Sequence, residues 1–318
     1  MLTIDQLCLR HAAWARGYYR KPNSRRATGT LNNFAEATRN LCETRYRPEW
    51  AAWQVRVGAI PADHMSAKIL YHVQQTMARS GRLNRNTINA RINKMRQIFA
   101  WAAKPQQGLI DEAIPVKLNL VEHLAYGRSP AKESAPVQAV PIEHVQQTCL
   151  HAGPKLRTLS TVLLYTGMRP GEACIMRRSD LTVSGDLWLY RPREHKSEHY
   201  GKERTVYIGP IGQEALTAWF GHISGDLVFE GALYGSYPTG EPVSEHAMQQ
   251  SVWRINRKHK LDHWWLNQLR HAHATMIEQQ TGNARDAQIV LDHSDLRTTG
   301  RYIDQDTKKK IELAQRFG

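Results

Sequence analysis

The first half of the chain has the hydrophobic pattern of a series of helices. In four stretches, apolar side chains recur every three or four residues, which places them on one face of an α-helix. These stretches span residues 4–15, 31–41, 69–77 and 88–102. Helix-breaking residues separate them, such as Pro22-Asn23-Ser24 after the first stretch and Ser80-Gly81 after the third. The pattern therefore predicts a helical domain.

The second half of the chain mixes helical and strand patterns. Residues 156–165 are apolar and helix-like, and Pro170 suits the first turn of a following helix. Residues 187–190 and 206–208 are short apolar segments on either side of a polar loop, which predicts two strands. Helical spacing returns in residues 245–260, 267–280 and 283–291. The prediction is an α+β chain, mainly helical, with a small antiparallel sheet in its second half.

A segment with few apolar residues separates the two halves. Residues 126–139, YGRSPAKESAPVQA, contain Gly, Ser, Pro and charged residues, which is typical of a linker. With 318 residues, the chain is long enough for two domains that each bury a core. The predicted domains are residues 1–125 and residues 140–318.

Basic residues are concentrated in the first half. The formal net charge is +14, and residues 1–130 hold 20 Lys and Arg against 8 Asp and Glu. Residues 131–318 are nearly neutral, with 23 Lys and Arg against 21 Asp and Glu. A basic domain beside a nearly neutral one indicates that the first domain binds a polyanion, with nucleic acid as the first candidate.

The sequence argues against membrane, secreted and cofactor-dependent classes of protein. It contains no run of about 18 apolar residues, and its first residues lack the order of a secretory signal. Four scattered cysteines without a CxxC pair argue against a disulfide framework or a zinc site, and they fit a reducing cytoplasm. No P-loop, Gly-rich dinucleotide turn or HExxH motif occurs, so no metal or other cofactor is predicted.

Three segments of the second half carry arginines, histidines and a tyrosine in a specific order. They are TGMRPGE (166–172), LNQLRHAHAT (266–275) and LDHSDLRTTGRY (291–302). These segments resemble the two arginine boxes and the final His-to-Tyr box of the tyrosine recombinases, the phage integrase family. The resemblance covers residues 140–305. It implies a catalytic domain preceded by a helical, SAM-like core-binding domain, and the two form a C-shaped clamp around duplex DNA.

The resemblance implies that Arg169 and Arg270 bind the phosphate and that Tyr302 is the nucleophile. Attack on a phosphodiester builds negative charge on its oxygens, and arginine stays cationic and binds phosphate through a planar fork. The phenol must lose its proton as it attacks, which nearby cations favour. The implied product is a 3′-phosphotyrosine with a free 5′-hydroxyl. That ester keeps the energy of the broken bond, so no ATP is needed.

The departing 5′-oxygen needs a proton, and Lys196 is the candidate general acid. It lies between the two predicted strands, and the family places this lysine in the turn of a β-hairpin. Lys202, just ahead of the second strand, is the competitor. His293 matches the histidine of the family's Leu-Gly-His element, although Asp292 replaces the glycine. It is expected to donate a hydrogen bond to a phosphate oxygen.

Asn267 is the clearest departure from the family, which usually has histidine there as a proton acceptor or phosphate contact. Asparagine can form hydrogen bonds but cannot take a proton at neutral pH. Asn267 is therefore expected to serve for positioning only, or the enzyme is slow or inactive. His271 is expected to buttress the site from within a helix. Glu172 either supports Arg169 through an ion pair or is an exposed helix carboxylate.

These residues predict a site-specific DNA recombinase of the cytoplasm. The resemblance implies double-stranded DNA as partner, a homotetramer on that DNA and cleavage without a divalent metal. It leaves room for accessory DNA-bending proteins. There are two alternatives. One is a DNA-binding relative that no longer cleaves, which Asn267 supports. The other is a type IB topoisomerase, which uses the same phosphotyrosine chemistry as a monomer.

Overall fold

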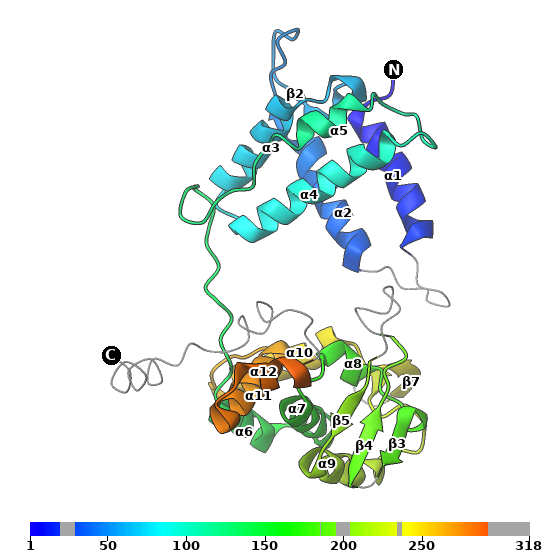
Figure 1. The fold of residues 1–318 in the computed structure, drawn as a ribbon, viewed down its shortest axis with the longest axis vertical. Helices are drawn as coiled ribbons and strands as arrows, with labels where there is room; N and C mark the ends of the chain where they lie inside the picture. The colour runs from blue at the N-terminus through cyan, green and yellow to red at the C-terminus, as the bar shows by residue number, and fades with distance from the viewer. Residues whose placement is uncertain (20–28, 185, 195–203, 234–236, 292–318) are drawn as a thin grey trace. The chain divides into compact units, whose positions relative to one another are not determined.

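The chain forms two compact units, Met1–Ala135 and Pro136–Gly318, in a computed structural model (Figure 1). The structure describes residues 1–19, 29–184, 186–194, 204–233 and 237–291. The boundary between the units falls within residues 126–139. Ala131 is buried in the core of the first unit, and Glu133 forms an ion pair with Arg85 at 2.9 Å. Residues up to Glu133 are therefore held to the first unit.

The first unit is built from helices and one short hairpin (Figure 1). The helices are α1 (Ile4–Tyr18), α2 (Gly29–Glu43), α3 (Ala67–Arg79), α4 (Arg85–Ala102) and α5 (Ala113–Leu118). Between α2 and α3 lie the antiparallel strands β1 (Arg45–Tyr46) and β2 (Val55–Arg56), followed by the 3₁₀ turns η1 (Val57–Ala59) and η2 (Ala62–His64). Thr3, Ser66 and Asn84 cap α1, α3 and α4, each accepting a backbone N–H of the first turn. These caps explain why the helices begin after polar residues.

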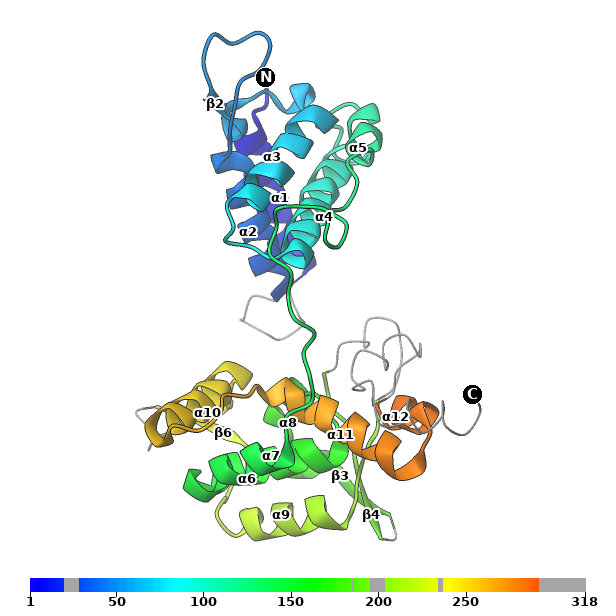
Figure 2. The same cartoon turned by 90° about the vertical axis from the view of Figure 1, so that its left-hand side faces the viewer.

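Helix α4 organises the core of the first unit, because it contacts α1, α2, α3 and α5 (Figure 2). The apolar stripe of the sequence is its inward face, and Ile88, Ile92 and Met95 are fully buried. Burying such a side chain stabilises a fold by about 1.5–3 kcal/mol. The helix predicted for residues 88–102 is therefore confirmed, and its apolar face lies in the core.

His11 belongs to this core although histidine is a polar residue. It is 2% exposed, and its ring centroid lies 4.6 Å from that of Phe34 and 5.2 Å from that of Trp101. Burial, assisted by the charge of Lys94, lowers the pKa of His11 to about 4. The ring is consequently neutral at pH 7 and packs as an aromatic side chain.

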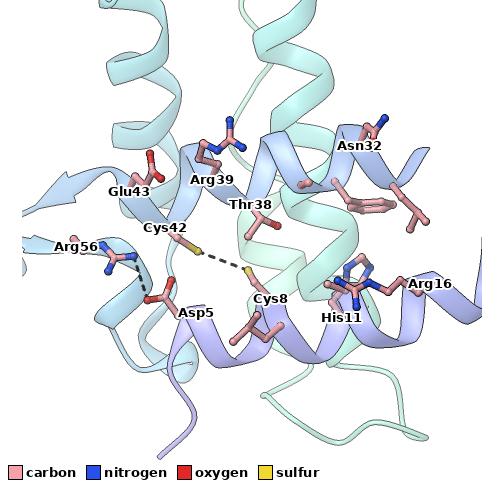
Figure 3. A pocket seen from close by; sticks show the side chains of 15 residues that line it. Asp5, Cys8, His11, Arg16, Asn32, Thr38, Arg39, Cys42, Glu43 and Arg56 are labelled. Carbon is pink, nitrogen blue, oxygen red and sulfur yellow. Dashed lines mark hydrogen bonds and ion pairs between the residues drawn. The ribbon is translucent and has the colours of Figure 1, made fainter. Parts of the chain in front are cut away.

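A groove of about 920 Å³ lies between α1 and α2 (Figure 3). In its wall the Cys42 thiol donates a hydrogen bond to the Cys8 sulfur at 3.9 Å, and Arg56 pairs with Asp5 at 3.3 Å. The bond with Cys8 and burial raise the pKa of the Cys42 thiol. This thiol therefore stays protonated and packs as a small apolar group. The lining residues all belong to the first unit, whereas the predicted catalytic residues begin at Arg169.

The second unit combines helices with small antiparallel sheets. Its helices are α6 (Ile142–His151), α7 (Pro154–Thr166), α8 (Pro170–Cys174), α9 (Pro210–Phe220), α10 (Glu245–His259), α11 (Leu266–Thr281) and α12 (Ala284–Val290). A 3₁₀ turn, η3 (Arg178–Asp180), leads into a sheet of β3 (Leu181–Ser184), β4 (Leu187–Tyr190) and β5 (Val206–Ile208). A separate hairpin is formed by β6 (Glu230–Leu233) and β7 (Tyr237–Pro242). The prediction of a mainly helical α+β fold with a small antiparallel sheet is confirmed.

Helix α7 is the centre of the second unit and packs against α9 and α11 (Figure 2). Leu159, Val162 and Leu163 of α7 are fully buried. The two strands predicted from sequence, β4 and β5, pair antiparallel with Leu189 opposite Tyr207. In the described part of the chain, no helix is long and apolar enough to cross a membrane.

Candidate active site

Arg169 lies in the turn between α7 and α8. Helix α7 ends at Thr166 and is capped by Gly167, whose backbone is left-handed (φ +62°) and whose N–H donates to the carbonyl of Leu163 at 3.0 Å. Pro170 occupies the first position of α8, and proline favours extended backbone in the residue before it. Arg169 adopts that conformation, with φ −72° and ψ 143°. The turn presents its side chain partly to solvent, with 30% exposed.

Glu172 fixes Arg169 from within α8. Its Oε1 accepts from Nη1 of Arg169 at 2.8 Å, and its Oε2 accepts from the Arg169 backbone N–H at 3.0 Å. Its Oε2 also lies 3.5 Å from Nη2 of Arg204. Burial alone would raise the pKa of Glu172, but Arg204 and Arg169 outweigh it, and the pKa lies below its ordinary value. Of the two interpretations of Glu172, the structure shows the ion pair with Arg169.

Arg270 is buried in α11 and joins three parts of the second unit. It is 1% exposed, and it donates to the carbonyls of Gly167 and of Leu291, the latter at 2.7 Å. These two bonds fix the plane of the guanidinium. Gly167 lies two residues before Arg169, so the segments that carry the two predicted phosphate-binding arginines are in direct contact. Leu291 lies two residues before His293 in the sequence.

Gly167 permits this contact because it has no side chain. A Cβ there would lie 2.5 Å from Cδ2 of His273 and 2.8 Å from Cδ2 of Leu291. The left-handed backbone of Gly167 also disfavours any residue with a Cβ. The glycine of the TGMRPGE segment is therefore required both by its backbone conformation and by its neighbours.

The start of α11 is fixed by Gln249, a buried side chain of α10. Its Nε2 donates to the carbonyl of Trp264 at 3.0 Å, and its Oε1 accepts from the N–H of Leu266 at 2.8 Å. The first N–H groups of a helix have no acceptor within the helix, so Gln249 supplies one. Trp264 in turn donates to Thr148 of α6 at 2.9 Å. These bonds hold the turn that carries Asn267.

Asn267 and Arg270 lie one helical turn apart on α11 and therefore share a face. Asn267 is exposed, whereas Arg270 and His271 are buried. His273 follows, and its pKa is lowered to about 4 by burial and by the charge of Arg270, against a hydrogen bond with the backbone of Leu164. His273 is therefore neutral at pH 7 and belongs to the packing around Gly167.

Four of the predicted residues lie outside the described residues. They are Lys196, its competitor Lys202, His293 and Tyr302. Of the predicted set, the structure thus places Arg169, Asn267 and Arg270 in the second unit. Three residues that the sequence did not single out support them, namely Gly167, Arg204 and Gln249. Among the described residues, no three His, Cys, Asp or Glu side chains are grouped so that they could hold a metal ion.

The sequence and the fold of this chain are similar to those of known proteins. A sequence model of the phage integrase family matches residues 142–309. Tyrosine recombinase XerC of Xanthomonas campestris pv. campestris (strain B100) is 27% identical over 235 residues, which are 70% of this chain. The match spans 65% of the length of that relative, which is just under two thirds.

Two solved structures show the same fold. One is a lambda integrase dimer bound to a COC′ core site, with a TM-score of 0.68 and 16% identity, covering 96% of this chain and 79% of the other. The other is a lambda integrase tetramer bound to a Holliday junction, with a TM-score of 0.66 and 15% identity, covering 95% and 78%. Both comparisons cover nearly the whole chain, so they extend beyond residues 142–309.

Proposed function

Since this chain belongs to the phage integrase family, we propose that it is a site-specific DNA recombinase that cleaves and rejoins DNA through a 3′-phosphotyrosine at Tyr302. The observation that carries the proposal is the bond from Arg270 to the carbonyl of Gly167. It joins the segment of Arg270 to the segment of Arg169, which are the two cations expected to bind one phosphate. A fixed pair of guanidiniums is what a phosphoryl transition state requires.

The chemistry follows from the residues of this chain. The Tyr302 oxygen attacks the phosphorus and loses its proton to water, while Arg169 and Arg270 stabilise the charge that grows on the phosphate oxygens. Lys196 gives a proton to the departing 5′-oxygen, and His293 donates a hydrogen bond to the phosphate. Asn267, exposed one turn before Arg270, contributes a hydrogen bond only. Attack by a 5′-hydroxyl on the phosphotyrosine reverses these steps and rejoins the strand.

The proposed partner is double-stranded DNA, bound by both units. Residues 1–130 have a large excess of Lys and Arg over Asp and Glu, which supports phosphate contacts by the first unit. We propose a homotetramer on DNA, as in the lambda integrase tetramer, because exchange of four strands between two duplexes needs four nucleophiles. Accessory DNA-bending proteins are compatible with this assembly.

A covalent trap tests the proposal. DNA from the ends of the genetic element that encodes the chain is nicked close to the cleavage site, so that the released fragment diffuses away and rejoining is blocked. The wild-type chain is expected to form an SDS-stable adduct at one site. Tyr302→Phe is expected to bind the same DNA and to form no adduct, because it keeps the ring but lacks the attacking oxygen.

Other outcomes point to other functions. An adduct with Tyr302→Phe would assign the nucleophile to another residue. Relaxation of supercoiled plasmid without a preferred site would identify a type IB topoisomerase. Sequence-specific binding without any adduct from the wild-type chain would identify a DNA-binding relative that does not cleave.

A further inference from the structure

Arg204 is a buried arginine that the proposed chemistry does not use. It is the first described residue after the segment 195–203 and lies two residues before β5. Its side chain is 2% exposed, and its Nη2 lies 3.5 Å from Oε2 of Glu172, which is 3% exposed. A charge this deeply buried needs a counter-charge, because desolvation costs several kcal/mol per ion. Glu172 provides that counter-charge.

The same carboxylate holds Arg169. Arg169 donates to Glu172 through both its backbone N–H and its Nη1. The side chain of Arg169 is 30% exposed, whereas that of Arg204 is 2% exposed. Arg169 is thus the member of this pair that DNA can reach. Glu172 thus pairs both with the partly exposed Arg169 and with Arg204, which is buried away from solvent.

The two ends of the segment between β4 and β5 both bond to Glu172. Tyr190, the last residue of β4, is fully buried and donates from its hydroxyl to the carbonyl of Glu172 at 2.7 Å. Arg204, at the other end, bonds to the carboxylate. Lys196 belongs to this segment and lies outside the described residues. Tyr190 and Arg204, described residues that precede and follow Lys196 in the sequence, are therefore both bonded to the residue that orients Arg169.

We propose that Arg204 is a positioning residue, which holds the base of the Lys196 segment on the carboxylate that orients Arg169. The inference rests on the proposed function and on Lys196 as the general acid. Removing Arg204 then leaves the proton donor in the chain but no longer at the leaving oxygen. Tyr190 does the same at the other end of the segment.

The test compares two substrates in single-turnover cleavage. In one, sulfur replaces the leaving 5′-oxygen, and a thiolate leaves without being protonated, so correct placement of the acid no longer matters. Arg204→Gln is expected to slow cleavage of the oxygen substrate by roughly tenfold to 100-fold, less than the full contribution typical of a general acid. It should cleave the sulfur substrate at nearly the wild-type rate and bind both DNAs as the wild type does. Tyr190→Phe should show the same rescue with a smaller initial loss.

Two variants calibrate the comparison. Lys196→Ala defines full rescue by sulfur. Arg193→Gln is the matched control, because Arg193 lies on the same segment but is exposed and pairs with Asp180 at 2.7 Å. Its ratio of rates on the two substrates should equal that of the wild type.

Equal losses on both substrates would overturn the inference, because Arg204 would then act on the phosphate site or on the fold and not on the acid. Wild-type cleavage of the oxygen substrate by Arg204→Gln would overturn it as well. If Arg204→Gln does not fold, Tyr190→Phe decides between the same outcomes. If the wild-type chain forms no adduct with either substrate, the proposed function itself fails, and this inference fails with it.

Discussion

The guanidinium of Arg270, on α11, donates a hydrogen bond to the backbone carbonyl of Gly167, which lies two residues before Arg169. The two residues are 103 positions apart in the sequence, so the contact exists only in the folded chain. It makes the geometry of both arginine segments depend on one glycine. Substitution of Gly167 should therefore alter the geometry of the proposed phosphate site while leaving both arginines in the chain.

We expect Gly167→Ala to unfold the second unit partially or to lower its stability strongly. A non-glycine residue in left-handed backbone costs roughly 1–3 kcal/mol. Overpacking against His273 and Leu291 adds roughly 1–3 kcal/mol. Urea unfolding measures the loss, and adduct formation should fall with it. Gly240→Ala is the control, because Gly240 has a similar backbone (φ +69°) but its Cβ would meet nothing within 4 Å. Equal losses in the two variants would show that the clash is absent.

Arg169→Ala and Arg270→Ala should each lose cleavage far more than DNA binding. Removing one preorganised charge donor typically costs on the order of 100-fold to 1,000-fold in rate. Their stabilities should differ, because Arg270→Ala strips a donor from two buried carbonyls, at roughly 1–3 kcal/mol for each unsatisfied group. Arg169→Ala should stay folded. Arg254→Ala, an exposed arginine bonded within its own helix, is the control. Near-wild-type cleavage by either variant would contradict a role at the phosphate.

The long helices were predictable because the residues that determine them lie within the helical segments themselves. The stripe of α4 and that of α1 can be read from apolar spacing alone, and their caps from Asn84 and Thr3. The hairpin β6–β7 could not be read in this way. Its segment includes Pro238, Gly240 and Pro242, which favour turns, and its strands form because they pair with each other. Tertiary pairing thus outweighs local propensity there.

In the candidate site, too, some residues could be identified from local sequence and others only from tertiary contacts. The resemblance of the sequence segments singled out Arg169 and Arg270, because the types and order of residues carry that information. It could not show that Arg204 is buried against Glu172, since nothing in the local sequence distinguishes Arg204 from a solvated turn residue. Long-range contacts decide that Arg169 is partly exposed and that Arg204 is buried.

Asn267→His should keep or raise the cleavage rate. Asn267 is exposed in the first turn of α11, so the larger ring needs no change in the core. Histidine can take a proton near neutral pH, which asparagine cannot do. Adduct formation measured across pH gives the test, and Asn267→Ala, expected to be slower than the wild type, is the control. A large loss with histidine would mean that the site depends on the amide.

Substitution of the two candidate lysines should separate their roles. Lys196→Ala is expected to cleave the oxygen substrate slowly and to be rescued by the sulfur substrate, because only the leaving-group proton is missing. For Lys202→Ala, the cleavage rate divided by that of the wild type should be the same on the oxygen substrate and on the sulfur substrate. Rescue of Lys202→Ala in place of Lys196→Ala would transfer the acid to that residue.

Stability should fall as the pH is lowered from about 6.5 to about 4, and buried histidines are one cause. Burial lowers the pKa of His11 and of His273 to about 4, whereas a histidine in the unfolded chain has a pKa of about 6.5. Between these values the unfolded chain binds protons and the folded chain does not. The stabilisation is therefore fully present above pH 6.5 and is lost as the pH falls toward 4. It amounts to at most about 3 kcal/mol for each histidine.

Urea unfolding at several pH values measures this slope, and His11→Gln and His273→Gln test its origin. Each variant lowers stability at pH 7, because a buried ring is lost, but each should flatten the slope between pH 6.5 and 4. His11 reports on the first unit and His273 on the second, so their effects should add. Glu172 acts in a lower range, since its pKa lies below the ordinary value and its contribution persists until the pH falls through that lowered pKa. A wild-type slope in both histidine variants would show that other groups cause the acid sensitivity.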